Sequence, residues 1–194
     1  MLTKIVQDKG FPDIIRASAL SRLAASPDNN AVVAIARSVK DSEPLKRQAA
    51  IEAAMPFDIN QRWRLLNPLL DDEHLPIRAE AARALAGMLI QPFPTGLNEQ
   101  DSKRLSSALD EYKGIQEYQA ERGYSHTNLG NLALTLQKPA QAKAHYLKAI
   151  SIEPIFAPAY VNLADLYRNQ GDENAAQAIL KQGLAVNAES GDIH

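Results

Sequence analysis

The residues of this chain with the clearest potential for chemistry are four histidines and one run of carboxylates. The histidines stand at positions 74, 126, 145 and 194, with no His-x3-His pair and no glutamate at ligand spacing on the same face. The run Asp71-Asp72-Glu73 precedes a helix start, where carboxylates favour the helix dipole and stay solvated. We interpret His126 and His145 as packing residues, and we expect no acid–base pair in the chain.

Composition excludes several further classes of site. The chain has no cysteine, which removes disulfides, thiolate zinc sites, a cysteine nucleophile and covalent haem attachment within it. It has no glycine-rich phosphate loop and no Gly-x-Ser-x-Gly sequence. We therefore predict that the chain is not an enzyme and carries no catalytic residue, no metal site and no cofactor of its own.

Charge and hydropathy limit the expected partners. Lysine and arginine number 21 and aspartate and glutamate 23, they are interspersed, and the net charge is −2. The adjacent Lys46 and Arg47 are too few for a basic patch, so we expect no nucleic acid and no anionic lipid surface as partner. No run of about 18 apolar residues is present, which predicts no membrane insertion. The opening residues MLTKIVQDKGFP contain no apolar core of signal-peptide length.

The elements that position these residues are predicted to be helices arranged in repeats. Alanine is abundant, glycine is scarce, and the alternating β-branched runs typical of strands are missing. In the first half, a spacing of 31 residues relates Arg16, Arg47 and Arg78, then Ala19, Ala50 and Ala81, and then Asp41 and Asp72. Each unit is predicted to be a helix pair that cannot bury its apolar face alone and must stack on its neighbours.

The segment DDEHLPIRAEAARAL, residues 71–85, resembles the Asp…Pro-Ile-Arg-x-x-Ala pattern of HEAT repeats. The resemblance covers residues 1–90. It implies that the aspartates and arginines link adjacent repeats by hydrogen bonds along a solenoid. On that basis Arg16, Arg47, Arg78, Asp41 and Asp72 are expected to be structural.

In the second half the spacing changes to 34 residues, which is the length of a tetratricopeptide repeat. The residues that recur are Asn128, Leu129, Leu132, Ala142 and Ala144, which return as Asn162, Leu163, Leu166, Ala176 and Ala178. Residues 123–190 resemble this family, with His126 at the position where a tryptophan is commonest. The fold class implied is all-α, a right-handed superhelix in which HEAT-like helix pairs continue into tetratricopeptide helix pairs.

The same reading divides the chain into three parts. Residues 1–90 are HEAT-like repeats, 91–102 are a linker rich in proline, glycine and turn formers, and 103–194 are the tetratricopeptide array. The array comprises a half-repeat at 103–122, full repeats at 123–156 and 157–190, and a truncated third repeat. Neither end shows the polar cap that solenoids need, so we expect a fragment of a larger bacterial protein.

The segment AYVNLADLYRNQG, residues 159–171, has an apolar and a polar face. The family resemblance implies that the first helix of each pair lines a concave groove. The residues expected in the groove are Thr127, Asn128, Asn131, Asn162, Asp165, Arg168 and Asn169, with Tyr124, Thr135 and Val161 beside them. Asparagine suits a peptide groove because one amide both donates to and accepts from an extended main chain. A clamp for a carboxyl terminus is not favoured, because Thr127 stands where the clamp lysine would. The open alternative is a polar face that is merely solvated.

These observations favour a non-catalytic scaffold for protein–protein interaction, which binds a peptide or a neighbouring domain in its groove. The chain is also similar to the C-terminal half of bacterial multihaem c-type cytochromes with tetratricopeptide repeats. That resemblance implies a spacer or accessory domain, a haem-bearing domain of the same polypeptide as a partner, and a periplasmic location; otherwise the location is cytoplasmic. The short HEAT-like period also resembles that of bilin lyases, which leaves a lyase component as a second alternative.

Overall fold

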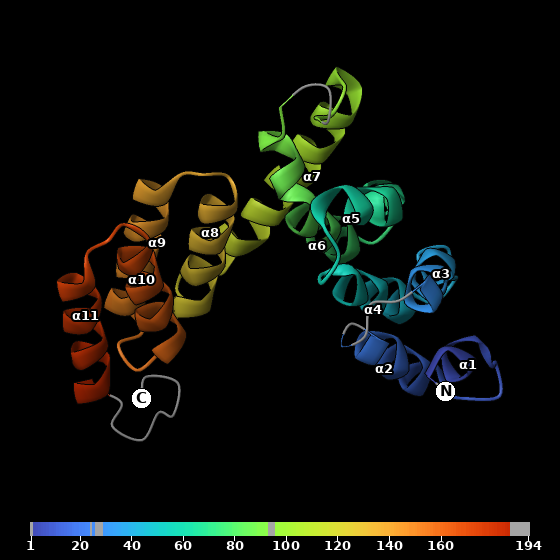
Figure 1. Cartoon of the computed structure of the whole chain (residues 1–194), viewed down its shortest axis with the longest axis horizontal. Coiled ribbons are helices and arrows are strands. Elements are labelled where there is room, and N and C mark those ends of the chain that lie inside the picture. The colour runs from blue at the N-terminus through green and yellow to red at the C-terminus, as the bar shows by residue number, and fades with distance from the viewer. Residues whose placement is uncertain (1, 24, 26–28, 93–95, 187–194) are drawn as a thin grey trace. The chain divides into compact units, whose positions relative to one another are not determined.

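The computed structural model describes residues 2–23, 25, 29–92 and 96–186. Helices and turns make up this part of the chain, and no strand occurs in it, so the all-α class is confirmed. By contacts between residues the chain divides into two compact units, Met1–Tyr112 and Lys113–His194. Figure 1 labels the helices of both units.

Unit 1 consists of short helices separated by turns. In chain order these are α1 (Leu2–Gln7), α2 (Asp13–Leu23), α3 (Asn29–Ser38), α4 (Pro44–Ala54), α5 (Ile59–Leu66), the 3-10 helix η1 (Asn67–Asp71), α6 (Leu75–Leu85) and the 3-10 helix η2 (Ala86–Ile90). The helix α7 (Glu99–Tyr118) begins in unit 1 and ends in unit 2.

Helices of unit 1 pack as pairs in two layers. The helices α1, α3 and α5 contact one another in succession, as do α2, α4 and α6, and each helix of the first layer contacts its partner in the second. The alanines Ala19, Ala50 and Ala81, equivalent positions of the 31-residue repeat, are each at most 5% exposed. Their small side chains allow the second-layer helices to approach closely, so the predicted stacking of helix pairs is observed within this unit.

Local signals explain where several helices begin. Pro44 occupies the first turn of α4, where its missing N–H has no partner to lose. The carboxylate of Asp58 accepts from the backbone N–H groups of the first turn of α5. Asn98 caps α7, because its Oδ1 accepts from the N–H of Asp101 at 2.8 Å. The segment 91–102, predicted as a linker, therefore already contains the start of α7.

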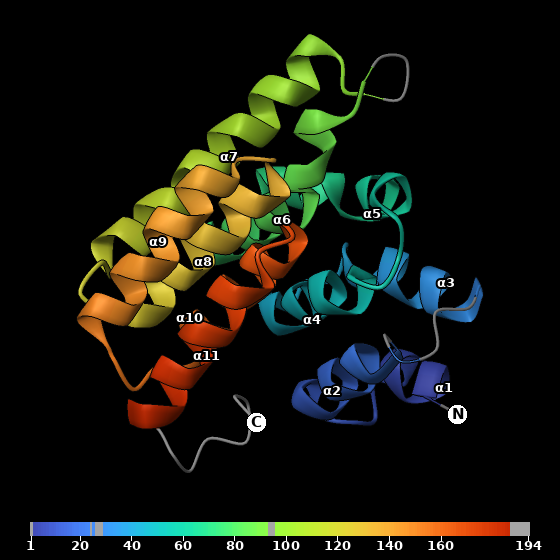
Figure 2. The ribbon, with the colours of Figure 1, turned by 60° about the vertical axis from the view of Figure 1, so that its left-hand side comes forward.

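Unit 2 contains the end of α7 and two helix pairs. The pairs are α8 (Gly123–Thr135) with α9 (Pro139–Ile152) and α10 (Ala157–Asn169) with α11 (Glu173–Val186). Figures 1 and 2 show α10 lying beside α8 and α9, with α11 on its other side. The first helix of the second pair therefore joins the two pairs.

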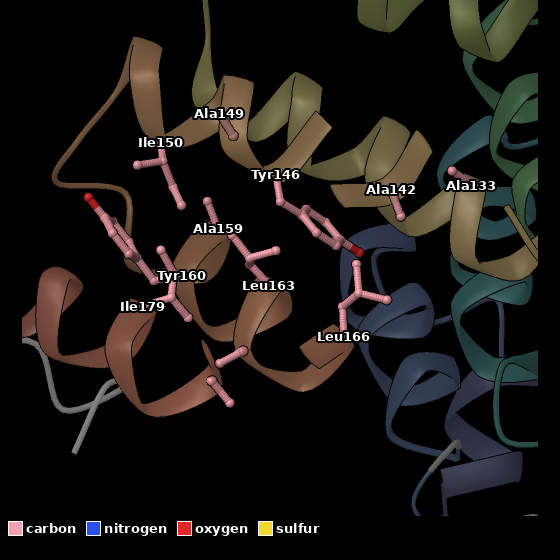
Figure 3. Close-up of a cluster of buried hydrophobic side chains, with 12 residues drawn as sticks. Ala133, Ala142, Tyr146, Ala149, Ile150, Ala159, Tyr160, Leu163, Leu166 and Ile179 are labelled. Carbon is pink, nitrogen blue, oxygen red and sulfur yellow. The ribbon is translucent and has the colours of Figure 1, made fainter. Parts of the chain in front are cut away.

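The core of these two pairs is built on large and small side chains in alternation (Figure 3). Tyr146 and Tyr160 are at most 1% exposed, and alanines at 142, 149 and 159 are fully buried around them. Gly130 gives Tyr146 its space, since a Cβ there would lie 2.4 Å from the ring carbon Cε1. This close approach is what the glycine at position 130 makes possible.

The turns that end α8 and α10 share one backbone form. Gln137 has a φ of 56° and Gly171, one repeat later, a φ of 79°. In each turn the next residue donates its N–H back into the helix, Lys138 to the carbonyl of Ala133 and Asp172 to that of Tyr167. This is the left-handed helix end that glycine adopts without strain, and Gln137 adopts it at a steric cost.

Candidate functional site

Helices α8 and α10 carry the polar side chains that were predicted to line a groove. Buried leucines on one face of each helix anchor it to the core and direct the polar side chains outward. The exposed members of the predicted set are Asn131, Asp165, Arg168 and Asn169, and the half-buried members are Asn128 and Asn162. Because α8 and α10 are in contact, these side chains come from two neighbouring repeats.

Thr127 is the exception in the predicted set. Its side chain is buried at 5% exposure, and its hydroxyl donates to the carbonyl oxygen of Gly123 at 3.1 Å. A buried hydroxyl that is already bonded to its own helix offers nothing to a ligand. We therefore leave Thr127 out of the proposed site.

A chain of three side chains joins the two repeats through Asn131. The hydroxyl of Tyr146 donates to Asn131 Oδ1 at 2.7 Å, and Asn162 Nδ2 donates to the same oxygen at 3.0 Å. Burial, and after it the negative charge of Asp165, raise the pKa of Tyr146 to about 12, so its hydroxyl keeps its proton and remains a donor. The side chain of Asn131 is thus held in one orientation by two donors.

The two asparagines that bond each other, Asn131 and Asn162, each keep one polar group available to a ligand. Within the described residues, Asn131 Nδ2 and Asn162 Oδ1 have no hydrogen-bond partner. An amide nitrogen supplies two donors and an amide oxygen accepts at two positions. Two side chains that are hydrogen-bonded to each other therefore offer one donor and one acceptor, which is the pair of groups that a peptide unit needs from its surroundings.

A second contact of the same kind lies one repeat earlier. Asn128 occupies the position in its repeat that Asn162 occupies in the next, and its Nδ2 donates to Oε1 of Gln116 on α7 at 3.1 Å. Gln116 is 7% exposed. In both repeats, therefore, the asparagine at this position bonds to a side-chain oxygen of an earlier helix, on α7 for Asn128 and on α8 for Asn162.

The charged members of the predicted set neutralise each other. Arg168 pairs with Asp165 at 3.1 Å and with Glu173 at 3.7 Å, and all three side chains are 44–58% exposed. Exposed pairs of this kind contribute little stability. Their consequence for the site is that Arg168 is engaged by carboxylates of its own chain, and the centre of the site is uncharged.

Tyr146, which bonds Asn131, and Gln116, which bonds Asn128, were not predicted as part of the site. The available signal for Tyr146 was its type, because a tyrosine at a core position still needs a partner for its hydroxyl. Gln116 gave no such signal, since nothing in the sequence distinguishes it from Gln100, the other glutamine of α7.

His126 and His145 form a pair between α8 and α9. Their Nδ1 atoms lie 3.3 Å apart and their ring centroids 5.6 Å apart. Burial lowers the pKa of both imidazoles; Lys148 adds to the lowering at His126, against a hydrogen bond to the backbone of Ala120, and His126 adds to it at His145. The two residues lie 19 positions apart on different helices, so no sequence spacing indicated the contact.

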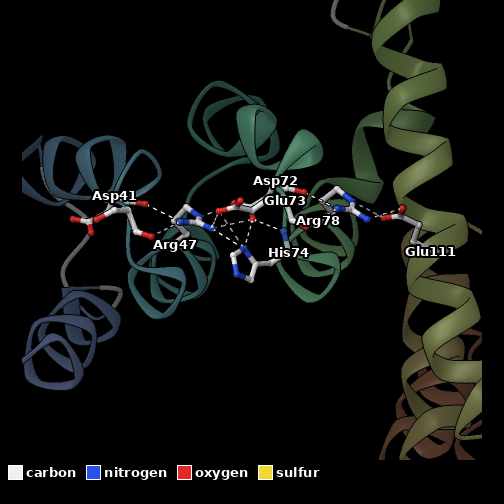
Figure 4. A network of polar contacts seen from close by, with 8 residues as sticks. Asp41, Arg47, Asp72, Glu73, His74, Arg78 and Glu111 are labelled. Carbon is white, nitrogen blue, oxygen red and sulfur yellow. Dashed lines mark hydrogen bonds and ion pairs between the residues drawn. The ribbon is translucent and has the colours of Figure 1, made fainter.

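The carboxylate run belongs to a polar network in unit 1 (Figure 4). Arg47 binds Asp72 with two nitrogens, Nε to Oδ2 at 2.6 Å and Nη2 to Oδ1 at 3.1 Å, and Nη1 reaches the carbonyls of Asp41 and Ser42. Its Nη2 also lies 3.0 Å from His74 Nδ1. Arg47 thus ties the turn before its own helix to the turn before α6, inside the next helix pair.

Two expectations about these residues need correction. Asp72 was expected to be solvated, but its side chain is 5% exposed because Arg47 covers it. The carboxylate of Asp41 was expected to bond an arginine, but it binds the buried Lys46, and Arg47 bonds the backbone carbonyl of Asp41. Arg16 bonds Asp13. The turns before α2 and α4 leave an open pocket of about 640 Å³ beside Arg16 and Asp41.

Acidification should weaken unit 1 through Asp72. Burial pushes the pKa of Asp72 up, but the hydrogen bonds from Arg47 and from the N–H of His74 hold it below 3.8. A carboxyl whose folded pKa is lowered contributes stability above its unfolded pKa and loses it as the pH falls through the folded value. We expect the free energy of unfolding, measured by urea denaturation with the fluorescence of Trp63 in unit 1, to fall as the pH drops below about 3.8. The Asp72→Asn variant should be less stable at neutral pH and lose less on acidification; equal losses in both proteins would contradict the role of Asp72.

Two overlapping segments of unit 2 match models of a known family. Residues 124–156 and residues 145–178 each match a family model described as the tetratricopeptide repeat. No curated protein matches the chain. Residues 124–178, which carry the asparagines, are therefore similar to tetratricopeptide repeats.

Between residues 2 and 186, outside the gaps given above, no group of three or more His, Cys, Asp or Glu residues is placed to hold a metal ion. Within the same residues, no helix is both long and apolar enough to span a bilayer.

Proposed function

We propose that the chain is a non-catalytic scaffold whose unit 2 binds an extended peptide, or an extended segment of a neighbouring domain, along α8 and α10. Tetratricopeptide repeats generally mediate protein–protein interaction. The observation that carries the finer proposal is the open donor of Asn131 beside the open acceptor of Asn162. Asn128, Asp165, Arg168 and Asn169 flank this centre.

Preorganisation supports the proposal. A surface asparagine usually loses rotamer freedom when a ligand binds, and that loss reduces affinity. Here the loss is already incurred in the free protein, because the buried Tyr146 and Asn162 fix the Asn131 amide. The amide nitrogen can therefore donate to a ligand carbonyl with little further ordering.

The alternative of a merely solvated face explains less. A helix face that serves only solubility needs no link to the core. Asn131 instead accepts a hydrogen bond from a tyrosine that is 0% exposed, and that bond selects which side of its amide faces outward. We infer that the ligand presents backbone carbonyl and N–H groups at this point and no charge. With only two full repeats, the expected affinity is micromolar, about −8 kcal/mol.

The test uses peptides selected from a random display library on the full chain. Fluorescence anisotropy of a selected peptide should show a loss of at least about tenfold in affinity for the Asn131→Ala, Asn162→Ala double variant. Asn169→Ala, an exposed asparagine on the same helix α10, serves as the matched control and should retain more affinity than the double variant. A haem-bearing domain, which the cytochrome resemblance implies as a partner, can be titrated in the same assay.

Folding must be separated from binding in this test. Asn131→Ala removes the acceptor of the buried Tyr146 hydroxyl, which costs about 1–3 kcal/mol of stability. Asn162→Ala leaves that bond in place, so the single variant carries the test if the double variant is unstable. Unchanged affinity in a folded Asn162→Ala variant and in the double variant would identify the face as ordinary surface.

For unit 1 we propose a HEAT-like structural role, in which arginines and carboxylates link successive helix pairs. The supporting observation is the Arg47–Asp72 bond between successive helix pairs, at the positions where the HEAT resemblance places its linking residues. Arg78 makes the equivalent contact, with two nitrogens, to Glu111 of α7.

A further inference from the structure

We infer that His126 and His145 are two ligands of a site for a divalent transition-metal cation such as Zn²⁺, with the remaining positions open to water. The pair lies between α8 and α9, and neither residue belongs to the peptide site proposed above. The inference is independent of that proposal.

The distance between the two nitrogens carries the argument. Two imidazole nitrogens bound to one tetrahedral zinc at about 2.05 Å each lie about 3.3–3.4 Å apart. The Nδ1 atoms of His126 and His145 are 3.3 Å apart in the protein without any metal to hold them. This contact is a hydrogen bond in which one ring donates its Nδ1–H to the other, and a cation that replaces that proton would meet both nitrogens at their present separation.

The environment keeps both rings in the form that binds metals. Zinc binds the neutral imidazole, and burial, which lowers the pKa of both rings, favours that form. The hydrogen bond between His126 and the backbone of Ala120 resembles the second-shell contacts that orient ligating histidines. Lys148 opposes a bound cation, because its positive charge already acts on His126.

The number of protein ligands limits the site. No third His, Cys, Asp or Glu within the described part of the chain is placed to complete it. A tetrahedral cation there keeps two positions for water, which makes it an open site of modest affinity. The same open positions could accept a ligand from a second copy of the chain.

The experiment is calorimetric titration of ZnCl₂ into the full chain, purified without a histidine tag and first treated with a chelator. We expect one Zn²⁺ per chain, with affinity lowered at least about tenfold in His126→Gln and in His145→Gln. The matched control is the double variant His74→Gln, His194→Gln, which should bind as the unchanged chain does. A stoichiometry of one Zn²⁺ per two chains, with binding lost in the same two variants, would support His126 and His145 as ligands. It would also show that a second copy of the chain supplies the remaining ligands.

Two results would overturn the inference. The first is no saturable binding of Zn²⁺. The second is binding that survives both His126→Gln and His145→Gln in folded protein. If either variant fails to fold, the imidazole nitrogen resonances of the unchanged chain provide the test. Zn²⁺ must then shift the resonances of His126 and His145 and leave those of His74 in place.

Discussion

The Arg47→Ala variant should unfold with a free energy about 3–5 kcal/mol below that of the unchanged chain, the range for removing one partner of a buried ion pair. The side chains of Arg47 and Asp72 are 8% and 5% exposed, so the substitution leaves a buried carboxylate without its cation. It also removes the donor to the carbonyls of Asp41 and Ser42. Urea unfolding followed by Trp63 fluorescence measures the loss in unit 1.

The matched control for this prediction is Arg83→Ala. Arg83 also binds a carboxylate at 2.7 Å, but its partner Glu80 lies on the same helix and both side chains are about one-third exposed. That pair should contribute less than about 1 kcal/mol. Equal unfolding curves for Arg47→Ala and Arg83→Ala would show that burial of the Arg47–Asp72 pair does not govern its contribution.

The Gly130→Ala variant should destabilise unit 2 by about 2 kcal/mol or more, in the upper range for overpacking a core. The new Cβ would lie 2.4 Å from Cε1 and 2.7 Å from Cδ1 of Tyr146, whose ring is fully buried and cannot move aside freely. The cost exceeds the gain of about 1 kcal/mol that alanine brings to a helix interior. Hydrogen exchange of the amides in α8 and α9 measures the change within this unit.

Two further variants separate the clash from the general effect of replacing a glycine. Gly114 on α7 has nothing within 4 Å of an added Cβ, so Gly114→Ala should be stabilising. One repeat after Gly130 and Tyr146, the chain has Ala164 and Leu180. Adding Tyr146→Leu to Gly130→Ala should therefore restore part of the lost stability. A double variant no more stable than Gly130→Ala alone would contradict the steric explanation.

The repeat spacings predicted most of the architecture. Positions 31 residues apart in unit 1 and 34 apart in unit 2 fall on equivalent helices, because apolar residues at a fixed period must meet the same core. The Arg47–Asp72 bond could also be expected, since it joins two repeated positions. The start of α7 at Glu99 departs from the predicted half-repeat at 103–122, because Asn98 caps the helix inside the predicted linker.

Contacts that depend on how neighbouring helices are rotated about their axes could not be predicted from the sequence. The Tyr146–Asn131 bond and the His126–His145 contact both link α9 to α8, and a small rotation of either helix would separate them. The partner of Arg78 also departs from the repeat. The next unit has the long helix α7 in place of a turn with aspartate, and Glu111 on that helix supplies the carboxylate.

The central claim is that the amides of Asn131 and Asn162 bind the backbone of an extended peptide. The most direct measurement follows their side-chain amide resonances in the full chain while a selected peptide is titrated. We predict that both shift with the dissociation constant measured by anisotropy, while the resonance of Asn169 shifts less. A peptide methylated at its central backbone nitrogens should bind at least about tenfold more weakly. Unshifted amides of Asn131 and Asn162 at saturation, with equal binding of the methylated peptide, would contradict the account.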